Sequence, residues 1–290
     1  MNPEIEGRQA AIDFRAKHGL GQQALGDLVA VIETTMKIDV AVLDVAANEH
    51  GLTMFDPQNQ AVFIGVASTP NPMRQRSTLA HELAHALFQD WRGLDTEVLS
   101  QNDTREQRAN SFARHLLLPE AGLRDFVGER NLVRVSKADL SAVVQHFLVS
   151  PGLAAITLGN INFIDAATKA EWLDGSHTST PKLATQFGWS DQYRALQSDS
   201  SRVRAPQHLL ARAIHGYQEG VVTTQTIATI RGVDVREVES EFDEAGIRPK
   251  SYEAVLLDAA DLPEVTVDLD GLVDPKTPLG KDRPMESESE

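Results

Sequence analysis

The spacing of apolar side chains predicts helices on both sides of a short β-region. Residues 7–18 and 22–36 are predicted to be helices, and the second carries apolar residues three or four positions apart, Leu25, Leu28, Val29 and Ile32. A later helix is predicted to begin at Asn71-Pro72, because asparagine caps helices and proline fits the first helical position. Another is predicted from Thr104, which has the capping-box spacing to Gln107.

Three segments between these helices have the character of strands. Residues 38–45 are short and rich in β-branched side chains, and residues 52–55 and 61–66 follow with a turn signal at 56–59 between them. Because short connections favour antiparallel pairing, the sequence predicts a small antiparallel sheet. The fold class is therefore predicted to be α+β.

The second half of the chain is predicted to be helical. Residues 136–165 and 205–247 each have the cadence of a helix-turn-helix motif, and residues 174–182 are predicted to be a linker. Four parts are predicted: a mixed domain at 1–130, a small helix-turn-helix-like module at 131–173, a helical module at 183–250 and an acidic, disordered tail at 251–290.

Composition narrows the class of protein. Of the 290 residues, 41% are hydrophobic, enough for a packed core, and no run approaches the roughly 20 apolar residues that a membrane helix needs. The chain has no cysteine, which excludes disulfides and thiolate metal ligands. No signal peptide is visible at the N-terminus. We therefore expect a cytoplasmic protein without a membrane partner.

The charge of the chain disfavours a nucleic-acid partner. The net charge is −15, and residues 251–290 carry 11 acidic and three basic residues. Helix 235–245 would be the second helix of the later helix-turn-helix, but it offers only Arg236 against five acidic side chains. Because phosphate contacts supply most nonspecific nucleic-acid affinity, direct nucleic-acid binding is not expected.

The segment Thr78–Phe88 contains the pattern His-Glu-x-x-His. Residues four apart share a helix face, so His81 and His85 can direct both imidazoles at one zinc ion. Glu82 lies about 100° round the helix, where it can take a proton from a water that the metal activates. The alternative is an ordinary helix, but its apolar residues indicate burial, and burying these three side chains without partners would be costly.

A catalytic zinc site needs a third protein ligand, and Glu106 is the first candidate. It falls on the apolar stripe of the helix that begins at Thr104, where a carboxylate is seldom buried without a partner. A solvated residue in a frayed first turn is an equal alternative on spacing alone. Asp103, Glu97 and His115 are rival ligands.

Two runs resemble the ImmA/IrrE family of metallo-endopeptidases. They are RQRSTLAHELAHALF at 74–88 and EQRANSFARHLLLP at 106–119, and the resemblance covers residues 8–165. It implies that His81, His85 and Glu106 are the zinc ligands and that Glu82 is the catalytic base. Asn110 matches the family asparagine one turn beyond Glu106, which makes it a candidate partner of a ligand; a polar residue that faces a neighbouring loop is the alternative.

The resemblance also implies a fold and a function. The fold would be a zincin-like zinc peptidase domain with its small sheet against the two zinc helices. The substrate would be a helix-turn-helix, XRE-like transcriptional regulator, whose cleavage relieves repression in mobile elements or after stress in bacteria or phage. The alternative is a zinc-sensing regulatory protein that acts by binding alone, and Glu82 favours the enzyme because a structural site needs no base. Arg114-His115 departs from the smaller or acidic residues that are common in the family.

Two expectations concern the cleft beside the zinc helix. The 61–66 strand is expected to form its edge and to accept an extended peptide by strand addition. Arg74 and Arg76 lie in the first turn of the zinc helix, where the helix dipole disfavours cations. They either bind carboxylates of a substrate or a charged loop, or lie exposed to solvent.

Overall fold

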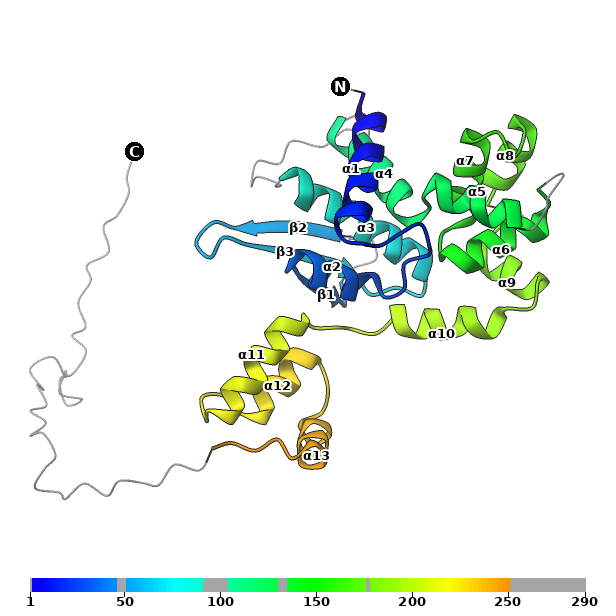
Figure 1. Ribbon diagram of the computed structural model, residues 1–290. Helices are drawn as coiled ribbons and strands as arrows, with labels where there is room; N and C mark the ends of the chain where they lie inside the picture. Colours follow the sequence, from blue (N-terminus) through cyan, green and yellow to red (C-terminus); the bar gives the residue numbers. More distant parts are fainter. Residues whose placement is uncertain (1, 46–50, 91–103, 130–134, 176–177, 251–290) are drawn as a thin grey trace, which may run out of the picture. The chain divides into compact units, whose positions relative to one another are not determined.

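The described part of the chain has a mixed α+β fold (Figure 1). It includes the four candidate site residues, His81, Glu82, His85 and Glu106. The predicted α+β class is therefore confirmed. The predicted tail at 251–290 lies outside the described residues. The structure is a computed structural model that describes residues 2–45, 51–90, 104–129, 135–175 and 178–250.

In the order of the chain, the three strands of the sheet lie between the second and the third helix. The strands are β1 (Asp39–Leu43), β2 (Gly51–Asp56) and β3 (Ala61–Ala67). The earlier helices are α1 (Pro3–Lys17), α2 (Leu28–Met36), α3 (Pro72–Phe88), α4 (Thr104–Leu117) and α5 (Glu120–Glu129). The middle helices are α6 (Lys137–Phe147), α7 (Pro151–Asn160), α8 (Ala166–Leu173), α9 (Thr180–Gln186) and α10 (Ser190–Ser200). The last helices are α11 (Gln207–Gln218), α12 (Thr224–Arg231) and α13 (Val235–Ala245).

Helix α2 begins later than the sequence pattern predicts. The side chain of Asp27 accepts a hydrogen bond of 3.1 Å from the N–H of Ala30, so Asp27 caps the helix and α2 starts at Leu28. Leu25 precedes the helix but is buried together with Leu28 and Ile32. The apolar spacing therefore predicted the buried side chains correctly and the start of the helix wrongly.

The sheet is mixed, which corrects the prediction of an antiparallel sheet. Its strand order is β1-β3-β2, in which β2 and β3 form an antiparallel hairpin. Strand β1 pairs with β3 in parallel, with Val40 opposite Ile64. The prediction was wrong because β1 does not pair with β2, its neighbour along the chain. Strand β3 is therefore central, and β2 is an edge strand.

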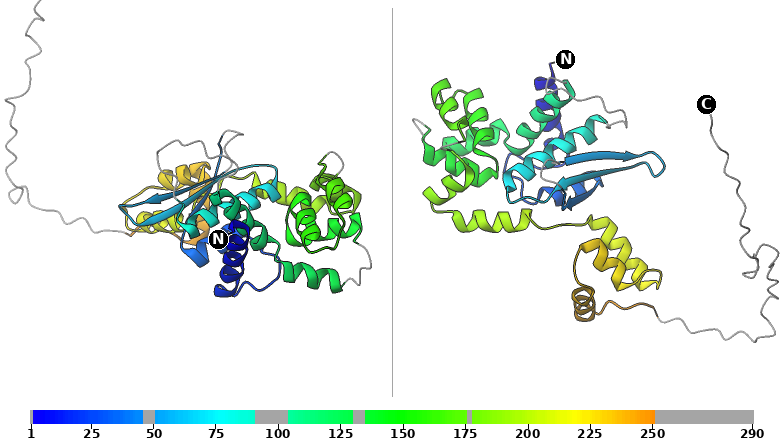
Figure 2. Two further views of the ribbon diagram at one scale, coloured as in Figure 1. Left: turned by 90° about the horizontal axis from the view of Figure 1, so that it is seen from above. Right: turned by 180° about the vertical axis from the view of Figure 1, so that it is seen from behind.

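Helix α3 covers one face of the sheet and carries the candidate site. It contacts β2 and β3, α4 packs against α3, and α1 packs against α4 (Figures 1 and 2). Ile64 of β3 and Leu83 of α3 are fully buried in the shared core. The apolar residues of α3 thus bury the helix, as its sequence predicts.

The core continues beyond the sheet into the middle helices. One hydrophobic cluster includes residues from α1 through to Tyr193 of α10, and residues 1–250 form one compact unit. The predicted boundaries inside this unit stay predictions.

Among the described residues, no single helix is long and apolar enough to cross a membrane, although the pair α6–α7, bent by 111°, passes by length and composition.

Part of the predicted linker at 174–182 is helical. Helix α9 begins at Thr180, whose side chain is buried, and α9 packs against α6. The indole N–H of Trp189 donates to the hydroxyl of Ser141 on α6 at 2.9 Å. The linker was predicted from the polar composition of this segment. Tertiary packing buries two of its threonines, Thr178 and Thr180.

The last three helices form a small cluster of their own. Its buried residues are Ile227, Ala228, Val238 and Phe242, and the predicted helical character of 205–247 is confirmed. The buried carboxylate of Glu33 on α2 accepts the N–H of Gln207 at 3.0 Å, where α11 begins. Backbone hydrogen bonds of 2.8 and 3.0 Å also join Val42 of β1 to Arg204. Helix α11 is therefore anchored beside β1.

Arg76 is buried, which corrects both interpretations of this residue from the sequence. Its guanidinium donates to the carbonyls of Leu25 and Gly26 at 2.6 Å and to that of Leu148 at 3.1 Å. Arg76 therefore joins the start of α2 and the end of α6 to α3. It neither binds a substrate nor lies in solvent.

We predict that Gly7→Ala destabilises the protein. A Cβ at Gly7 would collide with the backbone carbonyl of Arg108 and lie 2.8 Å from the backbone nitrogen of Phe112, so α1 would have to move away from α4. Overpacking of this kind costs about 1–3 kcal/mol. Urea unfolding measures it. In the control Gly128→Ala, on α5, the new methyl meets nothing within 4 Å, and equal stability of the two variants would contradict the prediction.

Candidate metal centre

Helix α3 places His81 and His85 on one face, one turn apart. Pro72 occupies the start of the helix, and Gln89 ends it in the left-handed conformation at φ 56°. The two imidazole rings meet edge to face with their centroids 4.7 Å apart. The spacing of four residues therefore brings both rings to the same point, as the sequence predicts.

Three side chains converge at that point. The Nε2 atoms of His81 and His85 lie 3.0 Å apart. The two carboxylate oxygens of Glu106 lie 3.1 Å from Nε2 of His81 and 3.4 Å from Nε2 of His85. One ligand atom from each residue lies within 4.8 Å of the others, so the group has the geometry to hold a metal ion.

Glu106 reaches the histidines because α4 packs against α3. It lies in the first turn of α4, and its side chain is only 20% exposed, so it is not a solvated residue in a frayed turn. His115, a rival ligand, contacts Glu4 of α1 instead. Glu97 and Asp103, the other rivals, lie outside the described residues.

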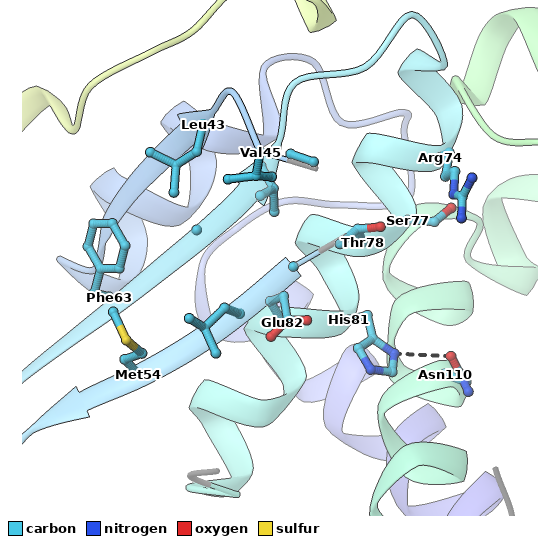
Figure 3. Close-up of a pocket in the computed structure, with 15 residues that line it drawn as sticks. Leu43, Val45, Met54, Phe63, Arg74, Ser77, Thr78, His81, Glu82 and Asn110 are labelled. Atoms are coloured by element: carbon cyan, nitrogen blue, oxygen red, sulfur yellow. Dashed lines mark hydrogen bonds between the residues drawn. The ribbon is translucent and has the colours of Figure 1, made fainter. Parts of the chain in front are cut away.

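The tautomer of His81 leaves a lone pair on the nitrogen that faces the point where the three side chains converge. The side-chain oxygen of Asn110 lies 3.0 Å from Nδ1 of His81, so Nδ1 carries the proton and donates it to this hydrogen bond (Figure 3). Nε2 of His81 then carries a lone pair. Asn110 is thus the partner of a candidate ligand, as the family resemblance implied.

The charges of these three side chains favour the binding of a cation. The imidazoles of His81 and His85 beside Glu106 hold the pKa of its carboxyl well below its usual range, although burial opposes this. Burial lowers the pKa of His85, but its hydrogen bond to Glu106 and the charges of Glu106, Glu82 and Asp90 outweigh burial, and the pKa of His85 is raised. A cation between the three groups satisfies all of them, and two imidazoles with one carboxylate are a donor set that zinc accepts.

Glu82 lies beside this group but has a different partner. It is buried between α3 and β2, and its Oε2 accepts a hydrogen bond of 2.7 Å from the hydroxyl of Thr53. Gly51 packs so closely that a Cβ there would lie 2.8 Å from Oε1 of Glu82. Strand β2 therefore sets the position of the Glu82 carboxylate.

A cleft of about 760 Å³ is lined by residues of the sheet, α3 and α4, and His81 and Glu82 are among them (Figure 3). Apolar side chains of the sheet line one side, namely Leu43, Leu52, Met54 and Phe63. Polar side chains line the other side, namely Arg74, Ser77, Thr78 and Asn110. The cleft can therefore admit a peptide to the side of the metal centre that carries Glu82.

Sequence reasoning missed three residues around the site. Thr53 holds Glu82, Asp90 faces His85, and Arg108 binds Asp90. A polar residue among the inward-facing positions of β2 is a signal that could have identified Thr53. No local pattern marks Asp90 or Arg108, because they are 18 positions apart and meet only through the packing of α4 on α3.

Comparison with known proteins identifies the domain that contains the site. Residues 34–158 match the model of the IrrE N-terminal-like domain, the peptidase M78 family. Comparison with curated proteins found no match to the chain. The matched segment contains His81, Glu82, His85 and Glu106, whereas α1 lies outside it. Residues 34–158 of the chain therefore form an IrrE N-terminal-like domain, the peptidase domain of the ImmA/IrrE metallopeptidase family.

Proposed function

We propose that the protein is a zinc-dependent endopeptidase with Glu82 as its catalytic base. The observation that carries this proposal is the position of Glu82, a buried carboxylate that lines the same cleft as His81 at the edge of the three-residue group. A site that only stores or senses zinc needs the three ligands alone. A carboxylate held beside them by its own hydrogen bond supports hydrolysis.

The ligands and the base have separate roles. His81, His85 and Glu106 would hold zinc, while Asn110 keeps the His81 ring in place. Zinc supplies Lewis acidity, which lowers the pKa of a water and polarises the scissile carbonyl. These side chains therefore orient the reaction without exchanging protons themselves.

Glu82 would move the proton. The hydroxyl of Thr53 occupies Oε2, so Oε1 is the oxygen that takes a proton from the attacking water. The same oxygen then passes the proton to the nitrogen of the leaving amine. Thr53 would keep the carboxylate from rotating between these two steps, because its hydroxyl lies 2.9 Å from the backbone carbonyl oxygen of Glu82 as well.

The edge of the cleft is β2 and not β3. The sequence interpretation assigned the substrate edge to the 61–66 strand, but β3 is the central strand and pairs with β1 over 63–67 and with β2 over 61–66. Strand β2 has one unpaired edge among the described residues. A substrate segment would lie extended beside β2, which requires a linker or a locally unfolded region in a folded substrate.

The substrate we propose is a helix-turn-helix transcriptional regulator in the cytoplasm. This part of the proposal rests on the resemblance to the ImmA/IrrE metallo-endopeptidases, in which cleavage of such a regulator relieves repression. Helix α13 supports it indirectly, because Glu237, Glu241 and Asp243 are exposed on it and disfavour nucleic acid as the partner. The helices after α5 would dock the regulator outside the cleft.

We predict that the purified chain binds about one zinc ion and that His81→Ala loses it, because two protein ligands hold zinc far less tightly than three. Metal analysis after dialysis measures the content. His215→Ala, which changes an exposed histidine of α11, is the matched control and keeps the metal. Equal zinc in wild type and His81→Ala would contradict the metal assignment.

We predict that Glu82→Gln keeps the fold and the zinc but loses about 10²–10⁴-fold in peptide hydrolysis. The amide preserves the volume and can still accept from the Thr53 hydroxyl, so only the base is removed. Initial rates and zinc content of both proteins are the measurements, with Glu171→Gln, on the exposed side of α8, as the control. Near wild-type rates in Glu82→Gln would show that Glu82 is not the base.

We predict that the zinc-loaded protein cleaves the helix-turn-helix regulator encoded beside it at one or a few sites and cleaves casein poorly. The helical modules would select the regulator, whereas casein only offers extended chain. Gel electrophoresis and mass spectrometry of the fragments provide the measurement. Efficient cleavage of casein with an intact regulator would point to a general protease instead.

A further inference from the structure

One nitrogen of His85 faces a carboxylate and has no hydrogen-bond partner among the residues that the structure describes. Nδ1 of His85 is buried, and Oδ2 of Asp90 lies 3.6 Å from it. Gln89 turns the chain back at the end of α3, and the N–H of Asp90 donates to the carbonyl of His85 at 2.9 Å. The backbone thus brings the Asp90 side chain to the side of the His85 ring opposite the metal group.

Asp90 is itself held by a cation. The guanidinium of Arg108 on α4 donates to both carboxylate oxygens of Asp90 at 2.9 Å, and it binds Glu6 on α1 at 2.6 Å. The guanidinium also lies 3.9 Å above the ring of Phe88. A guanidinium that binds one carboxylate through Nη2 and another through Nη1, and that lies over an aromatic ring, has little freedom to move.

Helix α1 completes the arrangement from outside the matched family domain. Glu6 lies next to Gly7, whose missing side chain lets α1 approach the backbone of α4 at Arg108. The chain of contacts runs from Glu6 through Arg108 and Asp90 to His85. It therefore connects an N-terminal helix to a metal ligand through three charged side chains.

Arg108 also limits the interactions that the Asp90 carboxylate can make. Two carboxylates flank the His85 ring: Glu106 lies 3.4 Å from Nε2, and Asp90 lies 3.6 Å from Nδ1. Because both oxygens of Asp90 are bound to Arg108, Asp90 stays out of the group of metal-binding atoms and offers only the free side of its carboxylate to Nδ1. It can orient the ring without competing for the metal.

We propose that Asp90, held by Arg108 and Glu6, is the positioning residue for His85. Its carboxylate keeps the proton of His85 on Nδ1, so that Nε2 directs its lone pair at the metal, and it fixes the plane of the ring. Asn110 performs the corresponding task for His81. The inference rests on the proposed metal site, and it extends that site to a helix that the family model does not cover.

Metal binding by the full-length chain tests this without any substrate. Asp90→Asn offers one acceptor oxygen in place of two, and Arg108 competes for it. We expect the Kd for zinc, measured by competition with a chelator, to rise about 10–100-fold. The melting temperature of the metal-free protein is expected to stay close to wild type. Asp191→Asn, at a side chain that is 94% exposed and forms an ion pair with Arg194, is the control.

The absorption spectrum of the cobalt-loaded protein separates positioning from simple charge loss. A reoriented His85 ring changes the ligand field, so the visible bands of Asp90→Asn should shift in position and intensity. A weaker Kd with an unchanged cobalt spectrum would mean that Asp90 contributes only its charge, and the proposal would be wrong. An unchanged Kd would overturn it directly.

A double-mutant cycle tests whether Arg108 acts through Asp90. Arg108→Met keeps packing against Phe88 and removes the cation, and we expect it to weaken zinc binding in the wild-type background. In the Asp90→Asn background the same change should have little further effect on the Kd. Independent, additive losses would refute the relay. A wild-type chain that binds no zinc would instead refute the proposed function, which is a separate result.

Discussion

The convergence of three metal-binding side chains is the constraint on which the site depends. Two imidazole nitrogens and a carboxylate meet within hydrogen-bonding distance in a partly buried place, and the imidazoles of His81 and His85 lower the pKa of Glu106. Such a group is costly to bury without a cation. The surrounding helices must therefore hold His81, His85 and Glu106 together with enough packing to offset that cost. All three side chains lie within residues 34–158, the segment that matches the IrrE N-terminal-like domain.

Packing between helices supplies the needed rigidity. Helix α4 delivers Glu106 to the histidines and Asn110 to the His81 ring, while α1 closes over α4 at Gly7. Arg108 joins the same two helices to the end of α3. Residues that do not contact the substrate thus influence the metal ligands, because they fix the orientation of the imidazole rings. The N-terminal helix belongs to the site in this physical sense, although it precedes the matched domain.

The sheet supplies the remaining part of the site. Strand β2 lies at the edge because β1 pairs with β3, and this order leaves Thr53 facing α3 and Leu52 facing the cleft. One strand thereby holds the Glu82 carboxylate on its inner face and lines the cleft with its outer face. An antiparallel sheet in chain order would have put β2 in the centre. The free edge and the position of Glu82 therefore follow from one topological choice.

The sequence by itself determined the contacts that lie within one helix, because a spacing of four residues places His81 and His85 side by side whatever surrounds them. It also identified Glu106 as a candidate, through a carboxylate on an apolar helix face and the family resemblance. Only the tertiary structure decided which elements meet: the parallel pairing of β1 with β3, the burial of Arg76, and the contacts of Thr53 and Asp90. Local spacing cannot encode these, because each joins elements whose packing depends on the whole core.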